Sequence, residues 1–418
     1  MQYMTKDPFS PSFGTTPPLL VGRDEVIQDF EYALENGPGQ QGRASLYVGN
    51  RGVGKTVLLS AIRERARQRG WIILAETATP GFIERLAQEH IPTRLNEIGA
   101  ARTKSRITGG TLSLAGAGIT LERGQSQEPV MQTLSGRLRR LVQAISNPDI
   151  GVLITLDEVN ADQAGEMREF AKTLQDARVE NLNVAFAGAG LAGNVNAVLT
   201  DKVITFFQRT EQHELGTVGL DDVKRAIREP IEASGRRIGS DALEAMAHGT
   251  GGYPFLIQLI GSGVWRQRPN EPEISMADVK TGVAWAYKRL GSQVYDLALR
   301  DTSTIDRSYL VAMAQDDGPS RTIDVAKRLG ESAGYGGVYR DRLITAGLIT
   351  AENLPYGTVD FKIPYLREYL REHAVSLAPR LDGIVSSDED LTTPRVDNDD
   401  SSEEESSRRP HGRGLTAR

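Results

Sequence analysis

The chain has 418 residues, of which 39% are hydrophobic and 25% charged, values that are typical of globular proteins with two or three domains. It contains no cysteine, which excludes disulfides, thiolate metal sites and cysteine nucleophiles and fits a reducing compartment. The formal net charge is −6, but ten Asp/Glu and one Arg lie between Asp382 and Glu405, so the rest is near neutral. No stretch approaches the roughly 20 apolar residues of a membrane span. We therefore expect a cytoplasmic protein without a membrane partner.

The N-terminal part of the chain leads from an irregular segment into a strand and a helix. Residues 1–16 have no periodic pattern and predict a flexible leader, and the next apolar spacing predicts a helix over 24–34. Residues 43–48 are a short apolar run that favours a strand, and residues 57–68 have helical spacing. The residues between them lie where a phosphate-binding loop occurs.

Those residues match the pattern G-x-x-x-x-G-K-[ST] in full. They are Gly49, Asn50, Arg51, Gly52, Val53, Gly54, Lys55 and Thr56. Glycines allow the backbone to wrap around a phosphate chain, and the free N–H groups of the following helix point at the anion. We expect Lys55 to reach the β- and γ-phosphates and the Thr56 hydroxyl to ligate Mg²⁺. The alternative, a glycine-rich turn that matches by chance, is disfavoured by the flanking strand and helix.

The next part of the chain contains one unusual segment. Strand and helix patterns alternate, with a strand predicted at 71–76, a short helix at 81–89 and a longer one at 130–145. Residues 108–121 instead alternate small or polar with apolar residues around glycines. This pattern predicts a β-hairpin inserted within residues 91–129. It is either an exposed loop without a specific ligand or a contact for a partner or nucleic acid through Arg102, Lys104 and Arg106.

A second motif lies about 100 residues beyond the loop. Residues 152–156 are five consecutive apolar or β-branched residues, typical of a strand that is buried on both faces of a parallel sheet. ATP hydrolysis requires a carboxylate on the metal side and a group that positions the attacking water. We expect Asp157 to serve Mg²⁺ and Glu158 to polarise the water. The alternative is that both residues only cap the next helix.

The patterns up to residue 299 indicate a sheet domain followed by helices. They predict a helix at 166–179, a buried strand at 183–187 and further strands at 203–207 and 211–215. Strands that alternate with helices and are continuously apolar predict a doubly wound α/β domain with a parallel sheet over residues 17–219. Strand patterns then stop, and an all-helical domain is predicted over residues 220–299, with helices at 221–233, 240–248, 254–266 and 275–290.

The C-terminal part predicts a third domain and a tail. Over residues 300–377, three helical stretches precede two strands around a polar turn at 353–357, which is the winged-helix order. Ten Lys/Arg face eleven Asp/Glu over residues 300–372, so there is no evident basic stripe for DNA. Residues 378–418 are rich in Ser, Asp and Glu and then in Arg, and predict a disordered tail.

The loop, the Asp-Glu strand, the helical domain and the winged helix together resemble AAA-type P-loop ATPases. The resemblance covers roughly residues 17–375 and is to the branch that contains origin-recognition initiators, archaeal-type ATPases and STAND signalling ATPases. It implies that the nucleotide is ATP and that the helical domain is a lid. It also implies that Arg23 packs near the adenine and that Pro254 begins a lid helix over the nucleotide. Proline at a first helical position is also ordinary helix initiation.

The resemblance also points to a phosphate-sensing arginine. Arg209 lies where related ATPases place one, in cis or from a neighbouring subunit. The alternative is a surface side chain that pairs with Glu211. Two departures from the initiator pattern argue against fast hydrolysis. The helix that begins at Pro254 has no arginine at the sensor position, and the strand at 183–187 leads into Gly188, Ala189 and Gly190 where a polar sensor is expected.

These observations lead to one leading hypothesis and two rivals. We expect a Mg²⁺-dependent ATPase of slow turnover whose nucleotide state, ATP or ADP, sets the orientation of the winged helix. The partner of residues 300–377 is then either DNA or a protein, a second copy of this chain included. The first rival is a STAND-like nucleotide-binding scaffold that does not hydrolyse ATP. The second, a replication initiator, is disfavoured by the two departures and the neutral winged helix.

Overall fold

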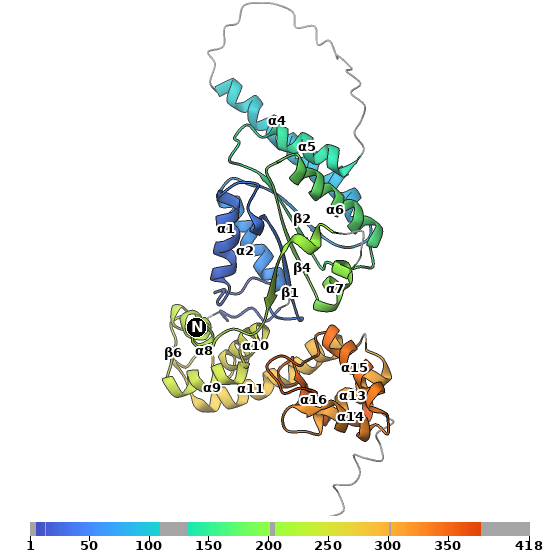
Figure 1. Ribbon diagram of the computed structural model, residues 1–418. Coiled ribbons are helices and arrows are strands. Elements are labelled where there is room, and N and C mark those ends of the chain that lie inside the picture. Colours follow the sequence, from blue (N-terminus) through green and yellow to red (C-terminus); the bar gives the residue numbers. More distant parts are fainter. Residues whose placement is uncertain (1–5, 13, 109–132, 201–204, 301, 378–418) are drawn as a thin grey trace, which may run out of the picture.

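The computed structural model describes residues 6–12, 14–108, 133–200, 205–300 and 302–377 (Figure 1). Its first half is built on a parallel sheet of five strands in the order β2-β3-β4-β1-β5. These are β1 (Ala44–Gly49), β2 (Ile72–Thr77), β3 (Val152–Asp157), β4 (Val184–Gly190) and β5 (Glu211–Leu215). Because all strands run in one direction, their carboxyl ends share an edge. Gly49 pairs with Leu215 there, and Thr77 with Asp157.

Helices cover both faces of this sheet, since successive side chains of each strand point into different cores. Tyr47 and Leu153 belong to the core on one face, under α1 (Asp24–Glu35) and α2 (Lys55–Gln68). Leu46 and Ile154 belong to the core on the other face. That second face is covered by α3 (Phe82–Arg85), the π-helical turn Leu86–His90, α4 (Ile91–Thr108), α5 (Leu134–Ala144), α6 (Ala164–Val179) and α7 (Ala192–Thr200). The predicted α/β fold with doubly buried strands is confirmed.

The lid follows the last strand and lies at one end of the sheet, drawn in yellow in Figure 1. It consists of α8 (Leu220–Ala233), α9 (Ser240–Thr250), α10 (Pro254–Trp265) and α11 (Met276–Leu290). It also contains a parallel pair of two-residue strands, β6 (Arg237–Ile238) and β7 (Glu273–Ile274), which the sequence analysis missed because they are too short to show a period. A π-helical turn (Gly291–Tyr295) and α12 (Asp296–Arg300) then lead into the last domain.

The last domain is a winged helix. Its helices are α13 (Thr304–Ala314), α14 (Thr322–Arg328) and α15 (Ala333–Thr345), and its antiparallel sheet has the order β8-β10-β9. The strands are β8 (Ser320–Arg321), β9 (Ile349–Thr350) and β10 (Thr358–Phe361), and α16 (Leu366–Glu372) and α17 (Ala374–Leu377) follow them. Among the helices that the structure describes, none has both the length and the apolar composition needed to cross a membrane.

One strand prediction within the α/β domain, that at 203–207, differs from the structure. Residues 205–206 form a turn and Phe207–Arg209 a 3-10 helix, while residues 201–204 lie outside the described residues. That run is apolar because Phe206 and Phe207 fill the core beside Phe170 and Phe186, not because it pairs in the sheet. The insertion at 91–129 begins as helix α4, whose Ile91, Leu95 and Ile98 pack on the core at helical spacing. The hairpin predicted at 108–121 falls on residues 109–132, outside the described part, as does the tail.

The prediction of a flexible leader at residues 1–16 is wrong for its described part. Residues 1–5 and 13 lie outside the described residues, but Phe9 is only 5% exposed and belongs to the core beneath the lid. The sequence pattern could not reveal this, because one isolated aromatic has no period. Its partner is helix α10, about 250 residues further along the chain.

Candidate functional site

The predicted phosphate-binding loop joins β1 to α2 at the carboxyl edge of the sheet. Gly54 precedes the helix with φ 91° and Gly52 has φ 78°, both in the left-handed region that favours glycine. The loop therefore turns sharply enough to present the start of α2 to the space above the sheet. Gly49 and Asn50, at the end of β1, are held from below by Lys55, whose Nζ donates to both carbonyl oxygens at 3.0 and 2.8 Å.

Lys55 is only 7% exposed, and its environment changes its acidity. Burial disfavours the ammonium and lowers the pKa to about 8, although the carboxylates of Glu158 and Asp157 act in the opposite direction. A buried lysine whose charge is only partly balanced is suited to receive an anion. A phosphate chain above the loop would supply the negative charge that this ammonium lacks.

Thr56 and Asp157 meet beside the loop, as the sequence predicts for a Mg²⁺ site. The Thr56 hydroxyl donates to Asp157 Oδ2 at 2.7 Å, across the gap between α2 and the end of β3. A hydroxyl and a carboxylate are oxygen ligands of the kind that Mg²⁺ takes beside nucleotide phosphates. These two residues therefore fit the ion that the motif implies.

Glu158 follows with an exposed side chain and a backbone φ of 53°. Such left-handed geometry costs a residue other than glycine about 1–3 kcal/mol and is found most often at functional sites. The next helix, α6, begins only at Ala164, with Gln163 as its N-cap. The alternative that Asp157 and Glu158 cap the next helix is therefore wrong.

A cavity of about 350 Å³ lies over the loop, within the range of small-ligand sites. It brings together most of the residues singled out in the sequence, namely Arg23, Arg51, Gly52, Val53, Gly54, Lys55, Thr56, Glu158 and Pro254. One wall is apolar and contains Leu19, Val21, Val218, Ala226 and Ile257. The cavity thus combines an anion-binding end with an apolar wall, as a nucleotide requires.

Arg23 joins three segments at this cavity. Its guanidinium donates to Gly22 O at 2.9 Å, to Val53 O of the loop at 3.3 Å and to Gly216 O at 2.6 Å. Burial to 8% exposure lowers its pKa. In this structure Arg23 therefore holds the loop against the end of β5. The packing against adenine that the resemblance implies remains a prediction.

The lid contacts the phosphate-binding loop directly, which the sequence analysis did not foresee. The N–H of Phe255, at the start of α10, donates to Gly52 O at 3.1 Å, and the Tyr253 hydroxyl donates to Arg51 O. Pro254 lies between them as the first residue of the helix. The sequence Gly-Gly-Tyr-Pro-Phe could have indicated this contact, because the residues on both sides of its proline make the bonds to the loop. A shift of the lid must move or break these bonds.

Arg209 lies far from this cavity in its own chain. It precedes β5, whose first residue Glu211 pairs with Ser45, so it is at the amino edge of the sheet. The cavity is at the carboxyl edge, and the five residues of β5, at a rise of about 3.3 Å each, separate the two edges. The prediction that Arg209 reaches the γ-phosphate in cis is therefore wrong. The exposed side chain leaves the prediction of a contact from a neighbouring subunit standing.

The end of β4 explains why no polar sensor follows that strand. A Cβ on Gly188 would lie 2.6 Å from the ring of Phe186, and one on Gly190 would lie 2.6 Å from Val159 O. Both contacts are too close for any side chain. Packing therefore requires glycine beside the site at these two positions.

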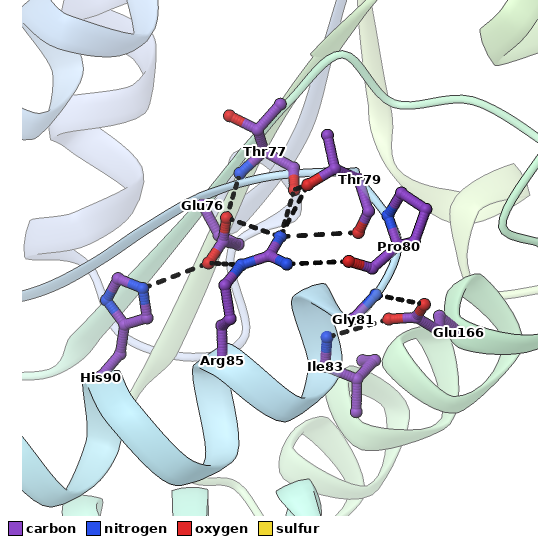
Figure 2. Close-up of polar contacts among 9 residues, drawn as sticks. All are labelled: Glu76, Thr77, Thr79, Pro80, Gly81, Ile83, Arg85, His90 and Glu166. Atoms are coloured by element: carbon purple, nitrogen blue, oxygen red, sulfur yellow. Dashed lines mark hydrogen bonds and ion pairs between the residues drawn. The ribbon is translucent and has the colours of Figure 1, made fainter.

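A second polar cluster, absent from the sequence analysis, fixes the turn after β2 (Figure 2). Arg85 donates to both carboxylate oxygens of Glu76 at 3.0 and 3.1 Å and to Pro80 O at 2.9 Å. His90 Nε2 lies 3.2 Å from Glu76 Oε2. Burial favours the neutral carboxyl, but the bonds from Arg85 and Thr77 outweigh it and leave the pKa of Glu76 below its usual value. The turn it holds reaches the metal-side strand, since Ala78 N–H donates to Asp157 O at 2.9 Å.

Comparison with known proteins agrees with this geometry. Residues 19–186 match the AAA ATPase domain family, and residues 292–370 match Domain of unknown function (DUF8462). The chain is similar to the Walker-type ATPase structure of Pyrococcus abyssi, at 17% identity and a TM-score of 0.56 over 84% of this chain and 96% of that one. It is also similar to the ORC2 protein of Aeropyrum pernix in its ADPNP–ADP complexes, at 15% identity and a TM-score of 0.57 over 90% and 96%. No curated protein matches significantly. At these identities the two structures show a shared fold.

Proposed function

We propose that this chain is an AAA ATPase that acts as a slow, Mg²⁺-dependent switch, in which the nucleotide on the phosphate-binding loop controls the docking of the winged helix. The observation that carries the proposal is a direct contact between the phosphate-binding loop and the winged helix. Gly347, in the turn after α15, lies against the Asn50 side chain of the loop, so closely that a side chain at position 347 would have to push Asn50 aside. A change in the loop therefore reaches the winged helix without an intermediary.

Two further contacts hold the winged helix on the α/β domain. Lys362, just after β10, forms an ion pair with Glu214 of β5. Gly193 of α7 approaches Thr345 O at the end of α15 so closely that a Cβ on Gly193 would lie 2.8 Å away. The Tyr295 hydroxyl, behind the lid, donates to Pro364 O at 2.6 Å. Toward the α/β domain, the described residues of the winged helix thus make few contacts, and a modest differential interaction with nucleotide is enough to shift them. The contacts with the lid are more extensive, since the ring of Tyr365 lies 4.2 Å from that of Tyr287 and Leu366 shares a core with the lid.

Each site residue has a proposed part in the reaction. Lys55 binds the β- and γ-phosphates, and Thr56 and Asp157 hold Mg²⁺, which neutralises charge on those phosphates when bound. Glu158, exposed at the cavity, accepts a hydrogen bond from the attacking water and orients it. The glycines at the end of β4 leave no polar group there to assist it, which agrees with slow turnover.

The charges on the winged helix favour a protein partner over DNA. All four basic side chains of α14 and α15 pair with carboxylates: Lys327 with Asp324 at 3.7 Å, Arg340 with Asp341 at 2.6 Å, Arg342 with Asp306 at 2.8 Å, and Arg328 with Asp316. Phosphate contacts by unpaired Lys and Arg supply most DNA affinity. We therefore propose that the released winged helix binds a protein, and that salt-dependent DNA binding is weak in every nucleotide state.

The test of the switch is Glu158→Gln, which keeps the size of the side chain and removes its basicity. We expect ATP hydrolysis to fall by roughly 10²- to 10⁴-fold while ATP binding persists, since general-base catalysis contributes about that much. Single-turnover hydrolysis and nucleotide binding would be measured side by side, with Glu169→Gln, exposed on α6, as a control for the loss of a carboxylate. Wild-type protein that binds ATP without turnover would support the rival, a non-hydrolysing scaffold.

A further inference from the structure

An N-terminal segment closes one side of the cavity described above. We name residues 6–12 and 14–17 the N-terminal strap. Ser10, Ser12, Gly14, Thr15 and Pro17 of the strap line the same cavity as the phosphate-binding loop. A ligand that fills this cavity therefore contacts the strap as well as the loop.

The strap is anchored on one face of the lid helix α10. Asp7 Oδ2 accepts a hydrogen bond from Ser262 Oγ at 2.6 Å, and Ser10 N–H donates to Gln258 Oε1 at 3.0 Å. Between these bonds, the ring of Phe9 fills the space above Gly261. Positions 258, 261 and 262 lie on one side of a helix because of their spacing of three and four. All three atoms nearest to a Cβ built on Gly261 belong to Phe9, so this glycine provides the seat for that ring.

The other end of the strap reaches the metal side of the loop. Thr15 N–H donates to Ser12 O at 3.3 Å and closes a turn, with Gly14 at φ 73° inside it. A Cβ on Gly14 would make van der Waals contact with Thr56 Cγ2 at 3.9 Å. The strap thus crosses from α10 to Thr56, over the two parts of the molecule between which a nucleotide would lie.

We propose that the N-terminal strap is the retaining element of the nucleotide site and that its anchor on α10 sets the rate of nucleotide exchange. This inference rests on the proposed nucleotide binding and adds its regulation. A nucleoside triphosphate or diphosphate in the cavity is covered by the strap, and it leaves after Phe9 has left its seat on Gly261. A partner that displaced the strap would accelerate exchange without touching the phosphate-binding loop.

The test uses the full chain loaded with a fluorescent ATP or ADP that carries an N-methylanthraniloyl group. Stopped-flow displacement by excess unlabelled nucleotide gives the dissociation rate. We expect Phe9→Ala to raise that rate by about tenfold or more, because loss of interface contacts acts mostly on dissociation. Gly261→Ala forces the ring from its seat from the other side and should have a similar effect. In the Phe9→Ala background, however, Gly261→Ala should add nothing.

The double variant separates release of the strap from general damage to the lid, because residues in contact give non-additive effects and independent ones add. Tyr356→Ala, which removes a fully exposed aromatic on the wing, is the matched control and should leave the rate unchanged. Wild-type protein that binds nucleotide and releases it at the same rate as both single variants would overturn the strap proposal alone. Additive effects of the two substitutions would also overturn it. Failure of the wild-type chain to bind any nucleotide would overturn the proposed function itself.

Discussion

The two sides of the nucleotide cavity are built in different ways. On the side of the sheet, charged and hydroxyl side chains of Lys55, Thr56 and Asp157 converge within two adjacent elements, α2 and the end of β3. On the side of the lid, backbone groups and apolar packing make the contacts, such as Phe255 N–H on Gly52 O and Phe9 on Gly261. The first side is suited to hold phosphates, and the second to respond when they are present. The division suggests that chemistry and signalling are separable by mutation.

Among variants that separate phosphate binding from the response of the lid, Lys55→Ala should have the largest effect. The variant removes the only ammonium that the structure buries beneath the phosphate-binding loop, and charge-assisted bonds to phosphate are among the strongest polar contacts. We expect ATP affinity to fall by about 100-fold or more, measured by titration calorimetry. Lys172→Ala, on the exposed face of α6, is the matched control. Affinity within threefold of wild type would place phosphate binding elsewhere.

The sheet side is also the side that the sequence predicts. Eight contiguous residues specify the loop, because a backbone that wraps a phosphate needs glycine, lysine and threonine at fixed spacing. The buried run at 152–156 likewise places Asp157 at the end of a strand. Local patterns therefore suffice wherever the relevant residues are neighbours in the chain.

The lid side and the docked winged helix depend on pairs that are distant in sequence, and no local pattern encodes them. Asp7 meets Ser262, and Asn50 meets Gly347, across some 250 and 300 residues. Phe9 and Gly347 are each ordinary residues until their partners are known. For Arg209 the sequence was misleading. Its place in the chain suggested a phosphate-sensing role, but its position at the amino edge of the sheet rules out that role within one chain.

The docking of the winged helix can be broken at Gly347. A valine there meets Asn50 and also adopts φ 73° with strain, so we expect a destabilisation of docking by about 1–3 kcal/mol. Hydrogen exchange at the end of α15 and in α7 should increase, with the fold of each domain kept. Gly330→Val is the control, because Gly330 has a φ of 71° and nothing near its missing side chain. Equal exchange in the two variants would mean that strain alone, and not the Asn50 contact, matters.

The sheet side should respond to pH through Lys55. Its pKa of about 8 in the free protein lies below the value that bound phosphates would restore. The binding energy from its charge is therefore fully present below pH 8, and affinity falls as pH rises from about 8 toward the higher pKa of the complex, by up to about tenfold per unit. Calorimetry at about pH 8.5 in two buffers should show proton uptake on ATP binding. Lys55→Arg, which stays charged, should make ATP affinity nearly independent of pH. A wild-type affinity that does not change up to pH 10 would contradict this prediction.

The smallest effect is expected at the edge of the docked winged helix, where Lys362 pairs with Glu214. Both side chains are partly exposed, Lys362 by 25% and Glu214 by 53%, and surface pairs of this kind contribute about 0.2–1 kcal/mol. Lys362→Ala should therefore raise hydrogen exchange in α15 only slightly, by a factor of about five at most, and less at high salt because the charges are screened. The exchanged pair, Lys362→Glu with Glu214→Lys, should restore docking. An effect of Lys362→Ala as large as that of Gly347→Val would mean that charge, rather than the contact with the phosphate-binding loop, holds the winged helix in place.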